Sequence, residues 1–134
     1  MLLVDTNVLL DVVEDDPHWG DWSKHQLDAQ SLRYRLIINP VIYAELSIGY
    51  RRIEELDQVL EIASIAMEQL PRPALFLAGK AFQRYRAQGG TRTGVLPNFF
   101  VGAHAAVANL PLLTRDSRRF RTYFPTVSLI APDA

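Results

Sequence analysis

The chain opens on Leu2-Leu3-Val4-Asp5-Thr6-Asn7-Val8-Leu9, where two apolar runs enclose three polar residues. A short apolar run such as 2–4 is typical of a buried strand. Thr6 or Asn7 is a candidate cap for a helix that continues through Val13. This stretch therefore predicts a strand, a helix, and an acidic side chain, Asp5, at the junction between them.

Short apolar strands alternate with helices along the rest of the chain. Further strands are predicted at 35–39, 112–114 and 127–130. Further helices are predicted from Pro17, over 40–48 and 52–67, from Pro73 to the Gly89-Gly90 pair, and over 97–108 and 116–123. Residues 88–95 form a polar, Gly-rich segment that we interpret as a mobile surface loop. The alternation favours an α/β fold with a central, mainly parallel sheet flanked by helices, in a single domain over 1–134.

Composition excludes several classes of protein. The 134 residues are 49% hydrophobic and include no cysteine, so disulfides, thiolate zinc sites and a cysteine nucleophile are excluded. Asp5 interrupts the first apolar run, which argues against a signal peptide. No later run reaches the roughly 18 apolar residues of a membrane span. We expect a soluble, cytoplasmic protein with no membrane association.

Charge is divided unevenly along the chain. Residues 1–68 contain five Lys or Arg and thirteen Asp or Glu, whereas residues 69–134 contain nine and two. Such asymmetry can place a basic nucleic-acid surface beside an acidic metal site. Two ordinary solvated faces explain it equally well.

Three carboxylates stand out because each breaks an apolar context: Asp5 and Asp116 follow predicted strands, and Glu45 lies inside an apolar helix. In parallel sheets, ligands bind at the carboxyl ends of the strands, so Asp5 and Asp116 are expected at the same edge. Clustered carboxylates repel one another unless a divalent cation neutralises them, and Mg²⁺ prefers such oxygen ligands. This pattern suggests metal-assisted phosphodiester hydrolysis. Taken singly, Asp5 and Asp116 are also possible helix caps, and Glu45 a solvated side chain.

Four segments together resemble the motifs of PIN domains. They are Leu3-Val4-Asp5-Thr6-Asn7-Val8-Leu9, Asn39-Pro40-Val41-Ile42-Tyr43-Ala44-Glu45-Leu46, Leu96-Pro97-Asn98-Phe99-Phe100-Val101-Gly102-Ala103-His104-Ala105 and Leu113-Thr114-Arg115-Asp116. Their order and spacing agree with the family over nearly the whole chain. The resemblance implies a PIN-like fold, an acidic pocket for Mg²⁺ or Mn²⁺, and endoribonuclease activity. A short chain of this kind looks like a VapC-type toxin, which is usually a homodimer inhibited by a cognate VapB-type antitoxin.

The resemblance also implies roles for individual residues. Asp5 and Asp116 would bind the metal ion, and Glu45 would position or activate the attacking water. Thr114 would support the acidic cluster by hydrogen bonding, and Thr6 and Asn7 would be further supporting residues.

Asn98 departs from the family pattern, in which an Asp metal ligand follows the proline of the third motif. The amide keeps the size and shape of Asp but removes a negative charge, and its oxygen can still coordinate weakly. Fewer charged ligands bind a cation less tightly. We therefore expect Asn98 to take the third ligand position in a chain that folds normally but cleaves poorly. The sequence allows either a natural variant or a deliberate inactivating change.

Several other polar residues invite an interpretation. Arginine pairs readily with phosphate, and Arg115 and Arg118 near the fourth motif are the favoured contacts to the RNA backbone. An antitoxin's acidic segment or water is the alternative partner. His104 is interpreted as a packed or surface residue and not as a ligand. The carboxylates Asp11, Asp15 and Asp16 are interpreted as a solvated helix end.

Apolar helix positions beyond those that a small core needs are candidates for a dimer surface or an antitoxin groove, although core packing is the simpler use of each. These positions are Val41, Ile42, Ile48, Ile53, Leu56 and Leu60.

Two other functions remain open. A PIN-like module that binds RNA or protein without catalysis is favoured by Asn98 and opposed by the three carboxylates. Another metal-dependent phosphotransfer enzyme, such as a phosphatase or receiver domain, is the second. A receiver needs a lysine after a late strand, and the two lysines, Lys24 and Lys80, do not occupy such a position.

Overall fold

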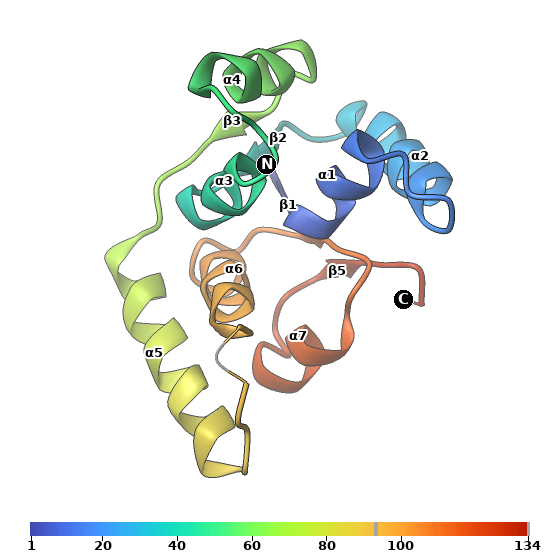
Figure 1. The fold of residues 1–134 in the computed structure, drawn as a ribbon. Helices are drawn as coiled ribbons and strands as arrows, with labels where there is room; N and C mark the ends of the chain where they lie inside the picture. The colour runs from blue at the N-terminus through green and yellow to red at the C-terminus, as the bar shows by residue number, and fades with distance from the viewer. Residues whose placement is uncertain (93, 134) are drawn as a thin grey trace.

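The computed structural model describes residues 1–92 and 94–133 and is built on a parallel five-stranded sheet (Figure 1). The strands lie in the order β3-β2-β1-β4-β5. Their bounds are β1 Leu2–Val4, β2 Leu36–Ile38, β3 Ala66–Met67, β4 Leu112–Leu113 and β5 Leu129–Ile130. The expected α/β class with a central parallel sheet flanked by helices is therefore confirmed.

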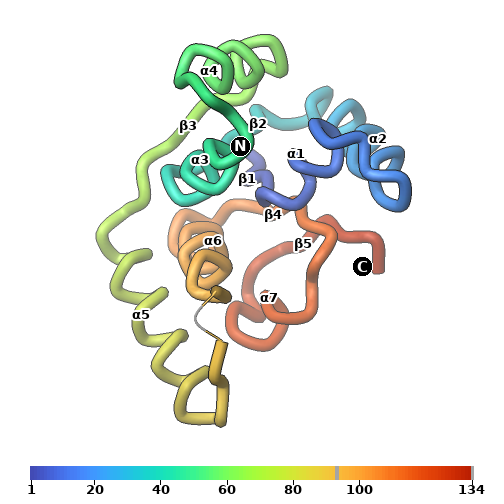
Figure 2. The backbone as a smooth tube through the Cα atoms, in the orientation of Figure 1, coloured from blue at the N-terminus to red at the C-terminus, as the bar shows by residue number. Residues whose placement is uncertain are grey.

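The helices of the described residues form two packed groups around the sheet. They are α1 Thr6–Val13, α2 Gly20–Ser31, α3 Pro40–Ser47, α4 Ile53–Ile62, α5 Arg72–Ala87, α6 Leu96–Val107 and α7 Arg118–Tyr123. Helix α1 packs against α2 and α3, while α6 packs against α5, α7 and α3. The backbone trace shows α5 running along α6, with the N-terminus near the centre of the fold (Figure 2). The contact between α3 and α6 joins the two groups.

Register brings three of the four sequence motifs to one edge of the sheet. Strand β1 pairs with β2 through Leu2 and Leu36, and with β4 through Val4 and Leu113. The residues that directly follow these three strands are Asp5, Asn39 and Thr114. Because parallel strands end at the same edge, these polar residues meet there.

The predicted helix over 52–67 is wrong in its second half. Helix α4 ends at Ile62, and the chain then enters the edge strand β3. Ser64 adopts a positive φ of 57°, which breaks the helix, and Ile65 returns to the core. The apolar spacing of 52–67 concealed the break because Ala63 and Ala66 continue the helical spacing beyond the last residue of α4.

Of the candidate caps of α1, the structure selects Asp5 and not Thr6 or Asn7. Asp5 is the N-cap, and its Oδ1 accepts a hydrogen bond from the Thr6 backbone N at 2.8 Å. Neither Thr6 nor Asn7 takes this role, because both already lie within the helix. Helix α5 ends as expected before the glycine pair, where Gly89 has a φ of 92°. Within the predicted 88–95 loop, Thr93 lies outside the described residues.

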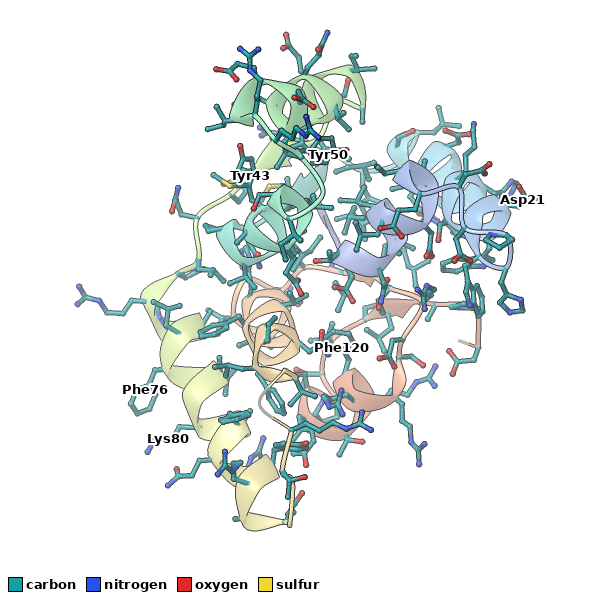
Figure 3. The ribbon with its side chains drawn as sticks, in the orientation of Figure 1. Asp21, Tyr43, Tyr50, Phe76, Lys80 and Phe120 are labelled. Carbon is teal, nitrogen blue, oxygen red and sulfur yellow. The ribbon has the colours of Figure 1, made fainter. Side chains whose placement is uncertain are left out.

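The core includes all three strands that carry the motifs, and Leu2, Leu3 and Val4 are fully buried. Phe120 fills the space between α6 and α7, whereas Phe76 and Lys80 point outward from α5 (Figure 3). Gly102 lets α6 approach Phe124, since a Cβ there would lie 2.3 Å from the phenylalanine ring. Among residues 1–92 and 94–133, no helix combines the length and apolar character needed to cross a membrane.

Candidate active site

The Asp5 carboxyl group lies at the end of β1 and is only 3% exposed. Its Oδ2 accepts hydrogen bonds from the Thr114 hydroxyl at 2.8 Å and from the Asn7 side-chain amide at 3.3 Å. Its Oδ1 accepts the hydrogen bond from the Thr6 backbone N–H that caps α1. Every described hydrogen bond to this carboxyl group is donated to it, which favours the ionised form.

Thr114 connects Asp5 with the loop that carries Asp116. While its hydroxyl donates to Asp5, its oxygen accepts the Asp116 backbone N–H at 3.1 Å. The same loop is held from the other side, because Asn7 Oδ1 accepts the Arg115 backbone N–H at 3.3 Å. The Asp116 side chain itself is exposed. Thr114 and Asn7 thus fix the loop and leave this carboxylate open to solvent.

Glu45 reaches the same region from α3. The Thr6 hydroxyl donates to Glu45 Oε1 at 2.6 Å, so the first residue of α1 contacts two of the three carboxylates. Asn39 starts α3 at the correct place by accepting the Ile42 backbone N–H at 3.0 Å. Pro40 follows at the first helical position, where a missing N–H costs nothing.

The charges of the other two carboxylates act on Asp5. The pKa of Asp5 is raised from 3.8 to about 6, chiefly by burial. Hydrogen bonds from Thr114 and Thr6 lower this pKa, while the charges of Glu45 and Asp116 raise it. The ionised Asp5 is therefore held at a cost in free energy that a nearby cation would relieve.

Asn98 lies in the first turn of α6 and is half-buried. Its backbone N donates to Val95 O at 3.0 Å. Within the two described ranges, no hydrogen bond joins its side chain to Asp5, Glu45 or Asp116. The structure therefore brings together the carboxylates and their supporting residues, and leaves the ligand role of Asn98 a prediction.

The donor set of this edge fits a hard divalent cation. Asp5 and Asp116 offer carboxylate oxygens, which Mg²⁺ and Mn²⁺ prefer. No group of three or more His, Cys, Asp or Glu in the described part of the chain is arranged to enclose a metal ion. Mg²⁺ typically uses only one or two protein carboxylates and fills its shell with water and substrate phosphate. An open, two-carboxylate site agrees with both facts.

Arg115 and Asp11 form a contact that the sequence did not reveal. The Arg115 Nε lies 2.8 Å from Asp11 Oδ2, and the guanidinium also lies over the Trp19 ring. Asp11 is 3% exposed and accepts a second hydrogen bond, from the Ser23 hydroxyl. The interpretation of Asp11 as part of a solvated helix end is wrong, because Arg115, more than a hundred residues later, neutralises it. Of these three carboxylates, only Asp15 is exposed. Asp16 is half-buried and accepts a hydrogen bond from the Trp19 backbone N–H.

His104 is packed inside the protein and contacts Asn39. It is 2% exposed, and its Nδ1 lies 3.2 Å from the Asn39 side-chain amide nitrogen. Burial lowers the pKa of His104, so the neutral ring accepts this hydrogen bond. The pair joins α3, which carries Glu45, to α6, which carries Asn98. An asparagine directly before a proline is a sequence signal for a helix cap, but the sequence contains no signal that His104 contacts this asparagine.

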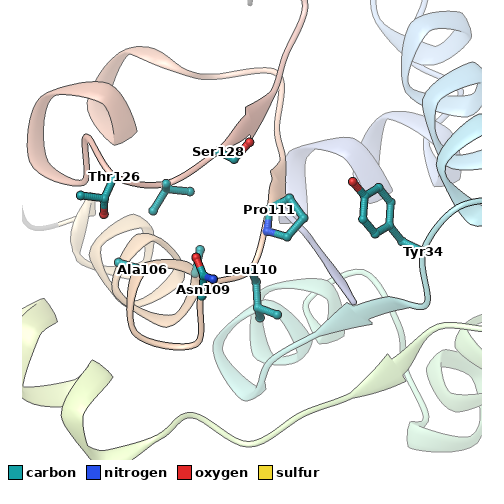
Figure 4. Close-up of a pocket in the computed structure, with 9 residues that line it drawn as sticks. Tyr34, Ala106, Asn109, Leu110, Pro111, Thr126 and Ser128 are labelled. Carbon is teal, nitrogen blue, oxygen red and sulfur yellow. The ribbon is translucent and has the colours of Figure 1, made fainter.

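A separate cavity of about 500 Å³ opens at the opposite edge of the sheet. Its lining includes Tyr34, Asn109, Leu110, Pro111, Thr126 and Ser128 (Figure 4). Tyr34, Pro111 and Ser128 precede strands β2, β4 and β5, so this cavity lies at the amino ends of the strands. It has no carboxylate or cation among its lining residues, and the acidic edge remains the candidate site.

The fold and the site together define an α/β protein with a parallel sheet of strand order 3-2-1-4-5 and an acidic cluster at its carboxyl edge. Asp5, from the first of the four motifs, directly follows the central strand β1. The family profile of the PIN domain matches residues 2–124. The chain belongs to the PIN domain family, a family of nucleases, which confirms the resemblance of its four motifs.

Solved structures show the same fold. VapBC2 from Rickettsia felis, bound to a promoter DNA fragment, is 17% identical with a TM-score of 0.72, and the match covers 97% of each chain. A toxin–antitoxin complex from Klebsiella pneumoniae is 18% identical with a TM-score of 0.71, over 98% of each chain. VapBC-1 from nontypeable Haemophilus influenzae is 16% identical with a TM-score of 0.72, over 97% of this chain and 96% of that one. No curated protein matches the sequence.

Proposed function

We propose that this chain is a toxin-type endoribonuclease that hydrolyses RNA phosphodiester bonds with Mg²⁺ or Mn²⁺. The observation that carries the proposal is the hydrogen-bonded edge at which Thr6 contacts Asp5 and Glu45 while Thr114 connects Asp5 with Asp116. Three of the four motifs contribute side chains to this edge, and the charges of Glu45 and Asp116 raise the pKa of Asp5.

Each residue of this edge has a defined task in the proposal. Asp5 and Asp116 would hold the cation, with Asn98 as a weak third ligand. A bound Mg²⁺ would neutralise charge on the scissile phosphate and activate the attacking water. Glu45, fixed by Thr6, would orient that water and accept its proton. Asn7 and Thr114 keep the Asp5 carboxylate in one orientation.

The proposed partner is a VapB-type antitoxin, which would inhibit the toxin in the cytoplasm. The similar structures include VapBC and toxin–antitoxin complexes, and this supports the proposal. Of the apolar positions considered above, Ile42, Leu56 and Leu60 are buried in the core, whereas Ile48 and Ile53 are 86% and 64% exposed. The exposed pair is available to an antitoxin or to the second subunit of a homodimer.

The presence of Asn98 is compatible with two functions, a slow nuclease and a binding module without catalysis. With one charged ligand fewer, the chain would bind the cation weakly and cleave RNA slowly. The alternative is a PIN module that binds RNA or protein and has lost catalysis. Restoring the carboxylate separates them, because only an intact catalytic edge gains activity from it.

The test is cleavage of total bacterial RNA by the chain and by its Asn98→Asp variant, each with Mg²⁺ and with chelator. We expect the variant to cut discrete RNAs only with metal, at a rate at least tenfold above that of the parent, as expected for a regained charged ligand. An Asp5→Asn, Asn98→Asp double variant controls for contaminating nuclease and should be inactive. If folded Asn98→Asp protein, free of antitoxin, cuts no RNA, the binding module replaces the enzyme.

A further inference from the structure

A cleft of about 380 Å³ opens directly beside Asp116. Its other lining residues are Tyr85, Arg92, Arg118, Arg119, Thr122 and Tyr123, which come from α5, the segment after it and α7. The cleft therefore combines three arginines, two tyrosines and one threonine with a carboxylate of the proposed catalytic edge. Of these residues, the sequence pattern favoured only Arg118 and Asp116 as site residues.

The arginines of the cleft differ from their neighbours in their partners. Arg115 is paired with Asp11 at 2.8 Å, and Arg121 with Asp133 at 3.1 Å. Within residues 1–92 and 94–133, neither Arg118 nor Arg119 has an acidic partner within 4.0 Å, and the same holds for Arg92. Cations gathered in one cleft repel one another, so an anion there would be bound favourably.

The aromatic wall of the cleft is firmly packed. Tyr85 stacks on Phe82 with centroids 5.8 Å apart and meets Tyr123 edge-on at 6.2 Å. Its hydroxyl oxygen accepts the Arg92 backbone N–H at 3.2 Å, and Gly90 leaves room for the ring, which a Cβ would approach to 2.5 Å. The guanidinium of Arg119 lies 5.8 Å from the Tyr85 ring centroid. The packed ring thus holds Arg119 over one side of the cleft.

We infer that this cleft binds one nucleotide of single-stranded RNA next to the scissile bond, with its phosphate on Arg119 and Arg92. This inference rests on the proposed nuclease function and identifies a substrate-binding subsite of it. Arginine beside aromatic side chains is the usual recognition surface for unpaired nucleotides. Because Asp116 lines the cleft, the bound strand continues into the acidic edge.

The test measures binding and not cleavage, so it does not depend on Asn98. A fluorescent single-stranded RNA of about eight nucleotides, within the usual range of such sites, is titrated in chelator with the chain and with Arg119→Gln and Arg92→Gln. Arg121→Gln is the matched control, because it removes the same charge from α7 at a residue already paired with Asp133. Thermal melting verifies that each variant is folded.

We expect Arg119→Gln and Arg92→Gln each to weaken binding about tenfold, as for a lost hydrogen bond to a charged group. Each should also reduce the slope of log affinity against log salt by about 0.7. Arg121→Gln should change the affinity less than about twofold, as for an exposed ion pair. If all three folded variants bind like the parent, the cleft inference is wrong while the nuclease proposal stands. If the parent binds no RNA, the cleft inference fails, and the cleavage assay decides the nuclease proposal separately. Equal binding of a fully paired RNA hairpin overturns the single-strand assignment.

Discussion

The pKa of the buried Asp5 carboxyl group is strongly shifted. Its pKa of about 6 lies above the ordinary 3.8 because burial opposes ionisation more than the hydrogen bonds from Thr114 and Thr6 favour it. The folded protein therefore holds this proton more tightly than the unfolded chain does. The resulting stabilisation is complete below the unfolded value of 3.8 and is lost as the pH rises through about 6.

This predicts a pH dependence that belongs to Asp5 alone. In chelator, the unfolding free energy of the chain minus that of Asp5→Asn should fall by about 3 kcal/mol between pH 3.5 and 7, as 1.36 kcal/mol per pKa unit implies. Urea denaturation at a series of pH values measures it. Subtracting the variant removes contributions from other carboxylates, such as Asp133, whose pKa is lowered. A difference that stays constant over this range would show that Asp5 titrates normally.

The ion pair between Arg115 and Asp11 predicts a loss of stability on mutation. Arg115→Met should cost about 1–2 kcal/mol, because it leaves the buried Asp11 carboxylate with Ser23 as its remaining side-chain donor. Since the Arg115 side chain is 33% exposed, solvent screens part of the pair. Lys24→Met is the control: its pair with Asp28 is 68% and 71% exposed and should cost under about 0.5 kcal/mol. Equal losses in both variants, measured by urea denaturation, would contradict the argument.

At the residue scale, the sequence predicted which carboxylates meet and that Thr6, Asn7 and Thr114 support them, but it did not predict the long-range contacts of Asp11 and Asn39. Asp5, Glu45 and Asp116 were recognisable because each interrupts an apolar run. The partners of Asp11 and Asn39 lie 104 and 65 positions away, at Arg115 and His104. Such pairs depend on how helices pack across the fold, and a local pattern does not contain that information.

At the element scale, most helices and strands follow from apolar periodicity and from capping residues. Asn39-Pro40 begins α3, and the glycine pair ends α5. Strand β3 was missed because its two residues, Ala66 and Met67, are only partly buried and follow a strongly periodic helix. A two-residue edge strand is identified by its pairing with Ile37 and Ile38, which only the fold supplies.

The break between α4 and β3 predicts a stabilising substitution. Ser64 has a φ of 57°, a region that costs a side-chain-bearing residue about 1–2 kcal/mol and costs glycine almost nothing. After the extra entropy of glycine in the unfolded chain, Ser64→Gly should raise the unfolding free energy by about 0.5–1 kcal/mol. The neighbouring Ala63, with a φ of −79°, is the control, and Ala63→Gly should lower it by a similar amount. If Ser64→Gly lowers the melting temperature, the backbone of Ser64 is not strained.

At the scale of the whole molecule, the uneven charge of the sequence becomes a local arrangement. Asp5 and Glu45 come from the acidic half of the chain, whereas Arg118 and Arg119 come from the basic half and line a cleft beside Asp116. The sequence allowed this juxtaposition of acidic and basic surfaces, and it allowed two ordinary solvated faces equally well. It did not indicate which arginines are free for a ligand, because Arg115 and Arg121 are distinguished only by folded partners.

The proposed function requires this acidic edge to bind a divalent cation through Asp5 and Asp116, with Asn98 as a weakened ligand. Titration with Mn²⁺, followed by electron paramagnetic resonance, tests it most directly in the parent, in Asn98→Asp and in Asp5→Asn. We predict one site, bound on the order of tenfold more tightly by Asn98→Asp than by the parent, and lost in Asp5→Asn. Equal Mn²⁺ affinity in all three folded proteins would contradict the account.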